Sequence, residues 1–150
     1  MQQPFKEAER WASQAKDDLR FVEWLAKEKI FFDKGCFIAQ QAGEKILKAC
    51  LYGSGKRQVL GHSLVELTAE LSRKDLRFKE IEAESRRLDR FYIPTRYPNG
   101  LPGGSPFQSF TTEDLETALT DLRKVFQIAA AYLEELRRAA GETLGQDLKD

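Results

Sequence analysis

The stretch Gln40–Leu51, which reads QQAGEKILKACL, decides the fold of this chain. Around a helix, at roughly 100° per residue, small and apolar residues gather on the face centred on Gly43. These residues are Cys36, Ala39, Ile46, Leu47 and Cys50. The opposite side mixes polar with large apolar residues, namely Gln41, Glu44, Lys45 and Lys48 with Phe37, Ile38, Leu51 and Tyr52. A helix that faced only solvent there would not carry such large apolar groups, so we expect neighbours on two sides of it.

The apolar residues of the other segments show the same helical period. The pattern predicts helices over residues 5–29, from Asp33 to about 52, from Ser63 onward, over 75–92 and over 112–140. Asp33 and Ser63 are suited to N-cap positions, and Ser63 with Glu66 forms a capping box. Residues 93–110 hold four of the five prolines and should form a loop. The expected fold class is all-α, an antiparallel up-and-down bundle of four main helices plus a shorter one, with 1–140 as a single domain and 141–150 as a polar tail.

The composition suits a reduced, cytoplasmic protein of one domain. The chain has 150 residues, and its 24 basic and 24 acidic residues give no general attraction to nucleic acid or to an anionic membrane. No stretch approaches the roughly 20 apolar residues of a membrane span, and the N-terminus lacks a signal-peptide core. Cys36 and Cys50 lie about 21 Å apart on one helix, beyond disulfide reach. With a single histidine, we expect neither a metal site nor a cofactor.

The polar residues of Gln40–Leu51 allow two interpretations. In the first, Glu44 and Lys48 form a surface pair one helical turn apart, which contributes a few tenths of a kcal/mol. In the second, this side of the helix is a subunit interface of a homodimer, where Gln41, Glu44 and Lys48 pair across the contact. Burying these groups without partners would be costly, so an interface requires that they be satisfied.

The loop Tyr92–Gly100 presents an arginine among aromatic residues. Pro94 and Pro98 stiffen the loop, and the planar fork of Arg96 suits a phosphate or a carboxylate. One hypothesis is a nucleotide site, with the phosphate on Arg96 and the base on Tyr92 or Tyr97. The alternative is a structural role in which Arg96 ties the loop to carbonyl groups and to a carboxylate such as Glu44, with Tyr97 packed on the bundle.

The lone histidine follows an arginine, since Arg57 and His62 are separated by four residues. Such a pair could cleave RNA, with His62 as general acid or base and Arg57 stabilising the phosphorane. The alternative is a helix-entry role, because His62 directly precedes Ser63 and could pack on Leu67.

Three motifs in this order resemble the HEPN domain, whose name stands for higher eukaryotes and prokaryotes nucleotide-binding. They are QQAGEKILKA at 40–49, GHSL at 61–64 and RYP at 96–98. The segments Ala8–Leu19 and Phe110–Asp114 fit the same family, so the resemblance covers about residues 5–138.

The resemblance implies a helical bundle that is commonly a homodimer, associates with nucleotides or RNA, and in bacteria often has a nucleotidyltransferase partner encoded nearby. Many HEPN proteins are metal-independent ribonucleases of toxin–antitoxin systems that use an Arg and a His a few residues apart. In those members the pair usually lies ahead of the last helix. This chain has the Arg96 loop there, without a histidine, whereas Arg57 and His62 lie before the third helix.

Three hypotheses for the function follow. The leading one is a homodimeric HEPN-type module, a binding protein more than an enzyme, that holds a nucleotide or RNA phosphate through Gln41, Glu44, Lys48, Arg96 and Tyr97 and that a nucleotidyltransferase could join. The second is a metal-independent endoribonuclease toxin that acts through Arg57 and His62. The third is a non-catalytic scaffold that docks a nucleotidyltransferase.

Overall fold

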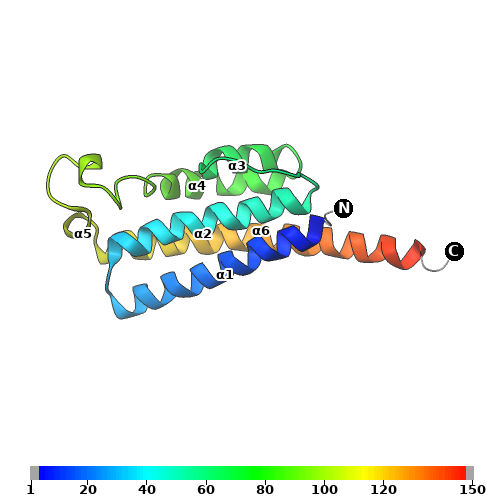
Figure 1. Cartoon of the computed structure of the whole chain (residues 1–150), viewed down its shortest axis with the longest axis horizontal. Helices are drawn as coiled ribbons and strands as arrows, with labels where there is room; N and C mark the ends of the chain where they lie inside the picture. The colour runs from blue at the N-terminus through cyan, green and yellow to red at the C-terminus, as the bar shows by residue number, and fades with distance from the viewer. Residues whose placement is uncertain (1–3, 148–150) are drawn as a thin grey trace.

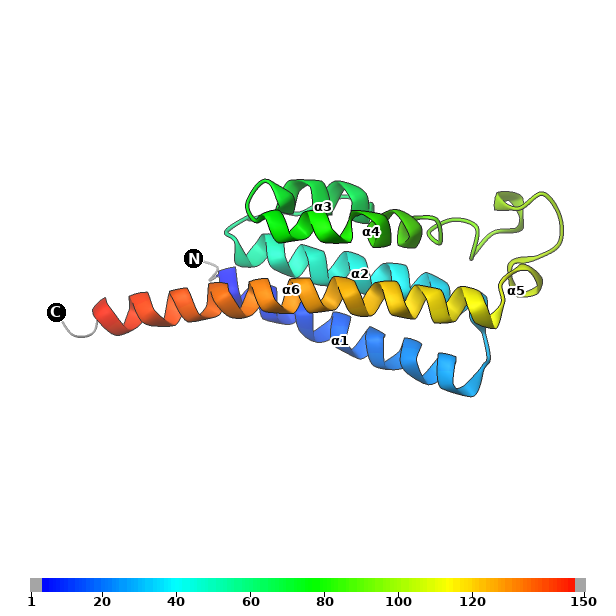
Figure 2. The ribbon, with the colours of Figure 1, turned by 180° about the vertical axis from the view of Figure 1, so that it is seen from behind.

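The computed structural model describes the backbone of residues 4–147 and the side chains of residues 4–141, and these residues form helices without a strand. Three long helices lie side by side, α1 (Pro4–Glu28), α2 (Phe32–Gly53) and α6 (Thr112–Asp147) (Figure 1). A shorter pair, α3 (Leu64–Ser72) and α4 (Glu82–Asp89), packs on α2 and α6 away from α1 (Figure 2). The predicted all-α helical bundle is confirmed.

The segment between α2 and α3, residues 54–63, doubles back along α2, and we call it the connector. His62, near its far end, hydrogen-bonds Glu44 in the middle of α2, whereas Lys56, near its start, forms an ion pair with Glu70 of α3. Helix α3 therefore runs in the same direction as α2. This path brings the lone histidine to the polar side of α2.

The small-residue face of α2 is buried, as its pattern predicts. A Cβ atom on Gly43 would lie 2.6 Å from Cδ2 of Leu64 in α3, and one on Gly35 would lie 2.6 Å from Cδ1 of Leu115 in α6. Both leucines are fully buried. Because protein interiors are close-packed, a Cβ at either position would force the facing leucine to move.

Helix α3 begins at the predicted cap. The Oγ of Ser63 accepts a hydrogen bond from the Glu66 N–H at 3.2 Å. The carboxylate of Asp89, at the end of α4, accepts hydrogen bonds from the Ser63 hydroxyl and from the N–H groups of Leu64 and Val65. A negative charge at a helix N-terminus is favourable, so these contacts fix the backbone directly after His62.

Two helix starts differ from the prediction. Helix α2 begins at Phe32, and its N-cap is Phe31, whose φ of 52° is in the left-handed region. Asp33 therefore lies inside the first turn and is not the cap. The helix expected over 75–92 begins as a 3-10 helix, η1 (Leu76–Ile81), before α4. The Asp75 side chain caps η1 by accepting a hydrogen bond from the backbone N–H of Arg77.

The second half of the chain also contains more helix than its prolines and polar residues predict. The proline-rich loop includes η2 (Pro98–Gly100) and α5 (Pro106–Ser109), each with proline at its first position, where the missing N–H has no helical partner to lose. Helix α6 continues to Asp147, whereas the sequence pattern predicts its end at about residue 140, so residues 141–147 of the expected polar tail are helical; 148–150 lie outside the described residues. One glycine, Gly141, costs a helix only about 1 kcal/mol.

Within residues 4–147, none of the helices has the length and apolar character that a membrane crossing requires.

Candidate functional site

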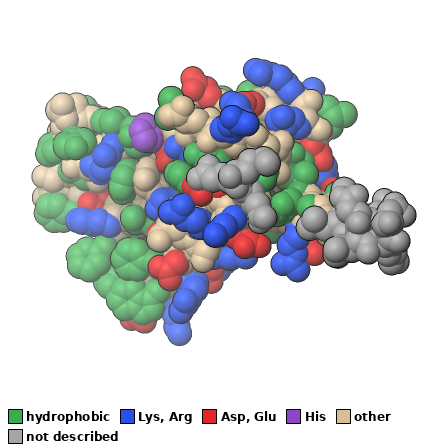
Figure 3. All heavy atoms as spheres, turned by 45° about the vertical axis from the view of Figure 1, so that its right-hand side comes forward, with side chains coloured by type: hydrophobic (Ala, Val, Ile, Leu, Met, Phe, Trp, Pro, Cys, Tyr) green, Lys and Arg blue, Asp and Glu red, His purple; other side chains and the backbone are tan. Residues whose placement is uncertain are grey.

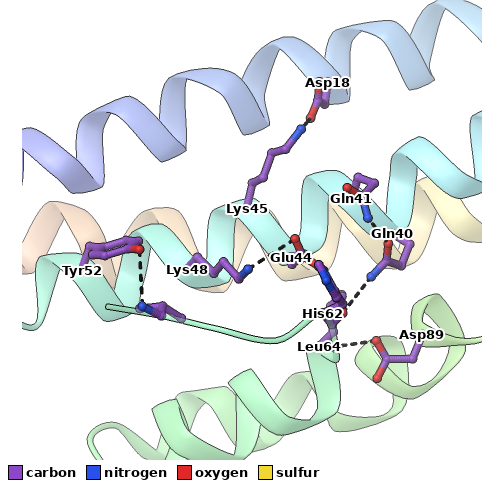
Figure 4. A network of polar contacts seen from close by, with 11 residues as sticks. Asp18, Gln40, Gln41, Glu44, Lys45, Lys48, Tyr52, His62, Leu64 and Asp89 are labelled. Atoms are coloured by element: carbon purple, nitrogen blue, oxygen red, sulfur yellow. Dashed lines mark hydrogen bonds and ion pairs between the residues drawn. The ribbon is translucent and has the colours of Figure 1, made fainter. Parts of the chain in front are cut away.

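A line of polar and aromatic side chains runs along the side of α2 that faces the connector (Figure 4). Glu44 stands at its centre and is only 5% exposed. One carboxylate oxygen, Oε1, accepts a hydrogen bond from Nδ1 of His62 at 2.8 Å, and the other, Oε2, lies 3.5 Å from Nζ of Lys48. Lys48 is equally buried, and its ammonium group also lies 5.5 Å from the centroid of the Trp11 ring. The pair is therefore a buried ion pair inside one chain.

His62 is held in place from several directions although 59% of its side chain is exposed. Gly61 has a φ of 94°, a conformation that residues with a Cβ rarely adopt, and this turn directs the chain toward α2. The side-chain amide of Gln40 donates a hydrogen bond to the His62 carbonyl oxygen at 2.9 Å. Figure 3 shows the histidine, in purple, at the molecular surface. The imidazole is thus fixed and accessible at once.

The hydrogen bond to Glu44 sets the tautomer of His62. A carboxylate can only accept, so Nδ1 carries the proton and the neutral ring leaves Nε2 with its lone pair. No hydrogen bond from the described residues occupies Nε2. A buried carboxylate behind an imidazole with an open second nitrogen is an arrangement that can donate and accept protons.

Arg96 is linked to His62 through the aromatic ring of Tyr92. The rings of His62 and Tyr92 stack, with centroids 5.0 Å apart and an interplanar angle of 20°. The guanidinium carbon of Arg96 lies 4.5 Å from the Tyr92 ring centroid and 4.6 Å from that of Phe37. His62 and Arg96 are therefore neighbours around one tyrosine, although they are far apart in the sequence.

The guanidinium group of Arg96 contacts a carbonyl oxygen and aromatic rings and has no acidic partner among the described residues. Its Nε donates to the carbonyl oxygen of Tyr92 at 2.7 Å, which fixes the side chain. The ring of Tyr97, 51% exposed, lies 5.2 Å from it. A hollow of about 350 Å³ opens beside it, lined by Asp33, Lys34, Phe37, Arg96, Pro98 and Phe107 among others. An oriented, uncompensated guanidinium at a hollow can bind a phosphate or carboxylate.

The structure decides between several sequence interpretations. Glu44 and Lys48 do form the predicted pair, but the pair is buried and not on the surface. Their partners lie in the same chain, so the polar side of α2 does not need a second subunit to satisfy these two residues. Gln41 is half-buried and donates a hydrogen bond to the Gln40 side chain at 2.7 Å. Gln40 in turn donates to the His62 carbonyl oxygen, so Gln40 links Gln41 to His62. Arg96 binds a carbonyl oxygen as predicted, whereas Glu44 pairs with His62 and Lys48 instead.

Arg57 and His62 are not brought together by any described contact. The Arg57 side chain is exposed, and no hydrogen bond, ion pair or ring contact joins it to another described residue. The ring that stacks on His62 is that of Tyr92, and the packing of His62 on Leu67 stays a prediction. The arginine that shares a neighbour with His62 is Arg96.

Three residues of the site lack a local sequence signal. Gln40, which is fully buried, binds the backbone of His62, and Asp89 caps the helix that follows His62. Trp11 of α1 covers Lys48. Each acts on a residue at least 20 positions away, so helical periodicity cannot reveal it, although a glutamine next to an apolar helix face is a hint for Gln40. No group of three or more potential metal ligands is found in the described residues.

Fold and site together define a small helical bundle in which a buried glutamate binds an accessible histidine and a nearby arginine has no acidic partner among the described residues. The chain matches the HEPN domain over residues 8–136. The crystal structure of TT1696 from Thermus thermophilus is similar, with 32% identity and a TM-score of 0.76 over 87% of this chain and 98% of that one. ST0689, an archaeal HEPN homologue, has 25% identity and a TM-score of 0.70 over 85% of this chain and 98% of its own. The chain belongs to the HEPN domain family.

A further relative carries a functional name. The protein named "Putative toxin MJ1304" of Methanocaldococcus jannaschii is 27% identical over 139 residues, which are 87% of this chain and 90% of that protein.

Proposed function

We propose that this chain is a HEPN module that binds the phosphate of a nucleotide or of RNA at Arg96, with Tyr97 beside it and His62 within reach. The observation that carries the proposal is the guanidinium of Arg96, which is oriented by Tyr92, lacks an acidic partner among the described residues and borders a hollow. Gln41, Glu44 and Lys48 serve this site indirectly, because they belong to the hydrogen-bonded network that holds His62.

Calorimetric titration with nucleoside monophosphates and a short single-stranded RNA tests this proposal. Arg96→Ala should weaken binding at least about tenfold, the effect of losing a charge-assisted hydrogen bond to the ligand. Arg57→Ala is the matched control, since it removes the same charge from an exposed residue without a described partner. Absence of binding by the folded wild type, or equal affinities of wild type and Arg96→Ala, refutes the proposal.

A second candidate is a metal-independent endoribonuclease toxin, favoured by the Glu44–His62 hydrogen bond and by the toxin name of the relative from Methanocaldococcus jannaschii. His62 would transfer the proton, and Arg96, in place of Arg57, would stabilise the charged phosphorane. Expression of the wild type should then arrest growth, His62→Ala and Arg96→Ala should relieve the arrest, and Arg57→Ala should leave it unchanged. Harmless expression of the wild type contradicts the toxin and leaves phosphate binding open.

We also propose that the module works as a homodimer, as HEPN domains commonly do. The charge pairs on α2 do not support this, but an exposed aromatic pair does. Phe21 and Trp24 near the end of α1 are 46% and 51% exposed, and their rings stack with centroids 6.5 Å apart. Exposed apolar patches often mark contacts between proteins. Light scattering should give twice the chain mass at micromolar concentration, and a monomer would overturn the dimer.

We propose a nucleotidyltransferase as the partner of this dimer, because HEPN proteins in bacteria often have such an enzyme encoded nearby. Co-purification with an enzyme encoded nearby tests this association. If that enzyme co-purifies while no nucleotide or RNA binds the chain, the scaffold hypothesis replaces the binding module.

A further inference from the structure

The hollow beside Arg96 has the features of a base-binding site. It lies between the first turn of α2, the loop around residues 95–98 and the short helix α5, and its volume of about 350 Å³ falls in the range of small-molecule pockets. We propose that it takes the guanine base of the nucleotide whose phosphate Arg96 holds, with Asp33 reading the base. This inference rests on the function proposed above and names the ligand class of that site.

Asp33 is the observation that points to a ligand. The residue is 4% exposed, and its carboxylate oxygen Oδ1 has no hydrogen-bond partner among the described residues. The other oxygen, Oδ2, lies 3.1 Å from Nζ of Lys34. Buried polar atoms without a partner are rare in native proteins, and a buried carboxylate is the most costly of them. Asp33 is one of the residues that line the hollow, so a ligand that enters there and displaces Lys34 can bring an N–H donor to this carboxylate.

The walls of the hollow suit a flat ring. Phe37 of α2 lines it from one element and Phe107 of α5 from another, and the Phe107 side chain is 66% exposed. The exposed ring of Phe107 is therefore available for a ligand in the hollow to stack on. Aromatic side chains beside a cationic group are the usual surfaces on which proteins stack nucleobases.

The chemistry of the bases selects guanine. Its Watson–Crick edge offers two adjacent donors, N1–H and the N2 amino group, which match the two acceptor oxygens of one carboxylate. Adenine and cytosine each place an acceptor nitrogen beside their amino group, and that nitrogen would repel the carboxylate. Uracil offers a single N–H between two carbonyl oxygens. A site built around hydrogen bonds discriminates strongly against ligands that leave its groups unpaired.

Lys34 completes the match. Its side chain is 57% exposed, so it can leave Asp33 at little cost and donate instead to the O6 acceptor of guanine, next to N1–H. Asp33, Lys34 and Arg96 all line the same hollow, so base and phosphate can be held together by one nucleotide.

Titration of the full chain with GMP and with AMP tests the inference. The wild type should bind GMP at least about tenfold more tightly than AMP. Asp33→Asn keeps the shape but replaces one acceptor by a donor, so it should weaken GMP binding about tenfold and leave AMP binding unchanged or stronger. Phe107→Ala is the matched control, because it removes a wall of the hollow without touching the reading group and should weaken both ligands alike.

The outcomes separate this inference from the function on which it rests. Equal affinities of the wild type for GMP and AMP overturn the guanine site while phosphate binding at Arg96 stands. If neither GMP nor AMP binds, the guanine site is overturned, and the proposed function is refuted with it when the single-stranded RNA does not bind either. Circular dichroism checks that Asp33→Asn is folded. If it is not, Lys34→Met, at the exposed neighbouring residue, takes its place. A loss of affinity for GMP alone in that variant supports the inference, whereas equal losses of affinity for GMP and AMP overturn it.

Discussion

Replacing Glu44 by glutamine tests whether its ion pair with Lys48 is buried inside the chain. The substitution keeps the shape and an oxygen that can still accept from Nδ1 of His62, but it removes the negative charge beside Lys48. Only 7% of the Lys48 side chain is exposed, so its ammonium group would be left in a dry environment with the Trp11 ring as its remaining partner. Breaking a buried ion pair costs about 3–5 kcal/mol.

The expected loss lies around the lower limit of that range. The Glu44–Lys48 distance of 3.5 Å is long for a strong pair, and the cation–π contact with Trp11 persists in the variant. We therefore expect Glu44→Gln to lower the free energy of unfolding by about 2–4 kcal/mol. In urea, where the slope is about 1–3 kcal/mol per molar, the unfolding midpoint should fall by about 1 M or more.

The double variant Glu44→Gln/Lys48→Met supplies the control. It removes both charges and keeps a side chain of similar volume at 48, so its stability should return to within about 1 kcal/mol of the wild type. The two single variants and the double variant should then give a coupling energy of about 2 kcal/mol. A loss below about 0.5 kcal/mol for Glu44→Gln, with no coupling, is the behaviour of a surface pair and would refute the buried network.

Two further predictions concern the packing of α2. Gly43→Ala should lower the free energy of unfolding by about 1–2 kcal/mol, because overpacking against Leu64 outweighs the better helix propensity of alanine. Gly141→Ala is the control, because its Cβ would meet nothing within 4 Å. This variant should be neutral or should stabilise the protein by up to about 1 kcal/mol. Thermal unfolding measures both. Burial raises the pKa of the Cys36 thiol to about 12 and also raises the pKa of Cys50, so neither thiol should react with a disulfide reagent at about pH 8 until urea unfolds the chain.

Opposite results would correct the packing described for α2. If Gly43→Ala and Gly141→Ala stabilise the protein equally, helix α3 does not approach Gly43 closely. If one thiol reacts at once in the native protein, that cysteine lies at the surface. Both cysteines are found buried, as their place on the small-residue face of the helix predicts.

Much of the fold follows from local patterns. The two faces of Gln40–Leu51 are distinguishable because a helix repeats its directions every few residues, so the residues themselves indicate which side is tightly packed. The cap at Ser63 is likewise local, since its hydroxyl binds a backbone group three residues ahead. The start of α2 is not, because Phe31 adopts a left-handed conformation that its residue type does not favour.

Local patterns predict individual residues of the candidate site but not how these residues are arranged. The sequence predicts Arg96 in a stiff aromatic loop, His62 before a helix and Glu44 with Lys48 on one helix side, each from its own neighbours. The sequence pairs His62 with Arg57, because these two residues are close along the chain and a sequence alone gives no distances in space. Arg57 is exposed and takes no part in the described contacts of the site.

The amino-acid sequence by itself determines that this chain is an all-helical HEPN bundle and that Gln40–Leu51 has neighbours on two sides. Tertiary structure alone decides what those neighbours are. The connector doubles back along α2, sets His62 against Glu44 and brings it to the ring of Tyr92, which it shares with Arg96. Helical periodicity is a property of adjacent residues, whereas the path of a connector depends on long-range contacts such as those of Gln40 and Asp89, which no local pattern encodes.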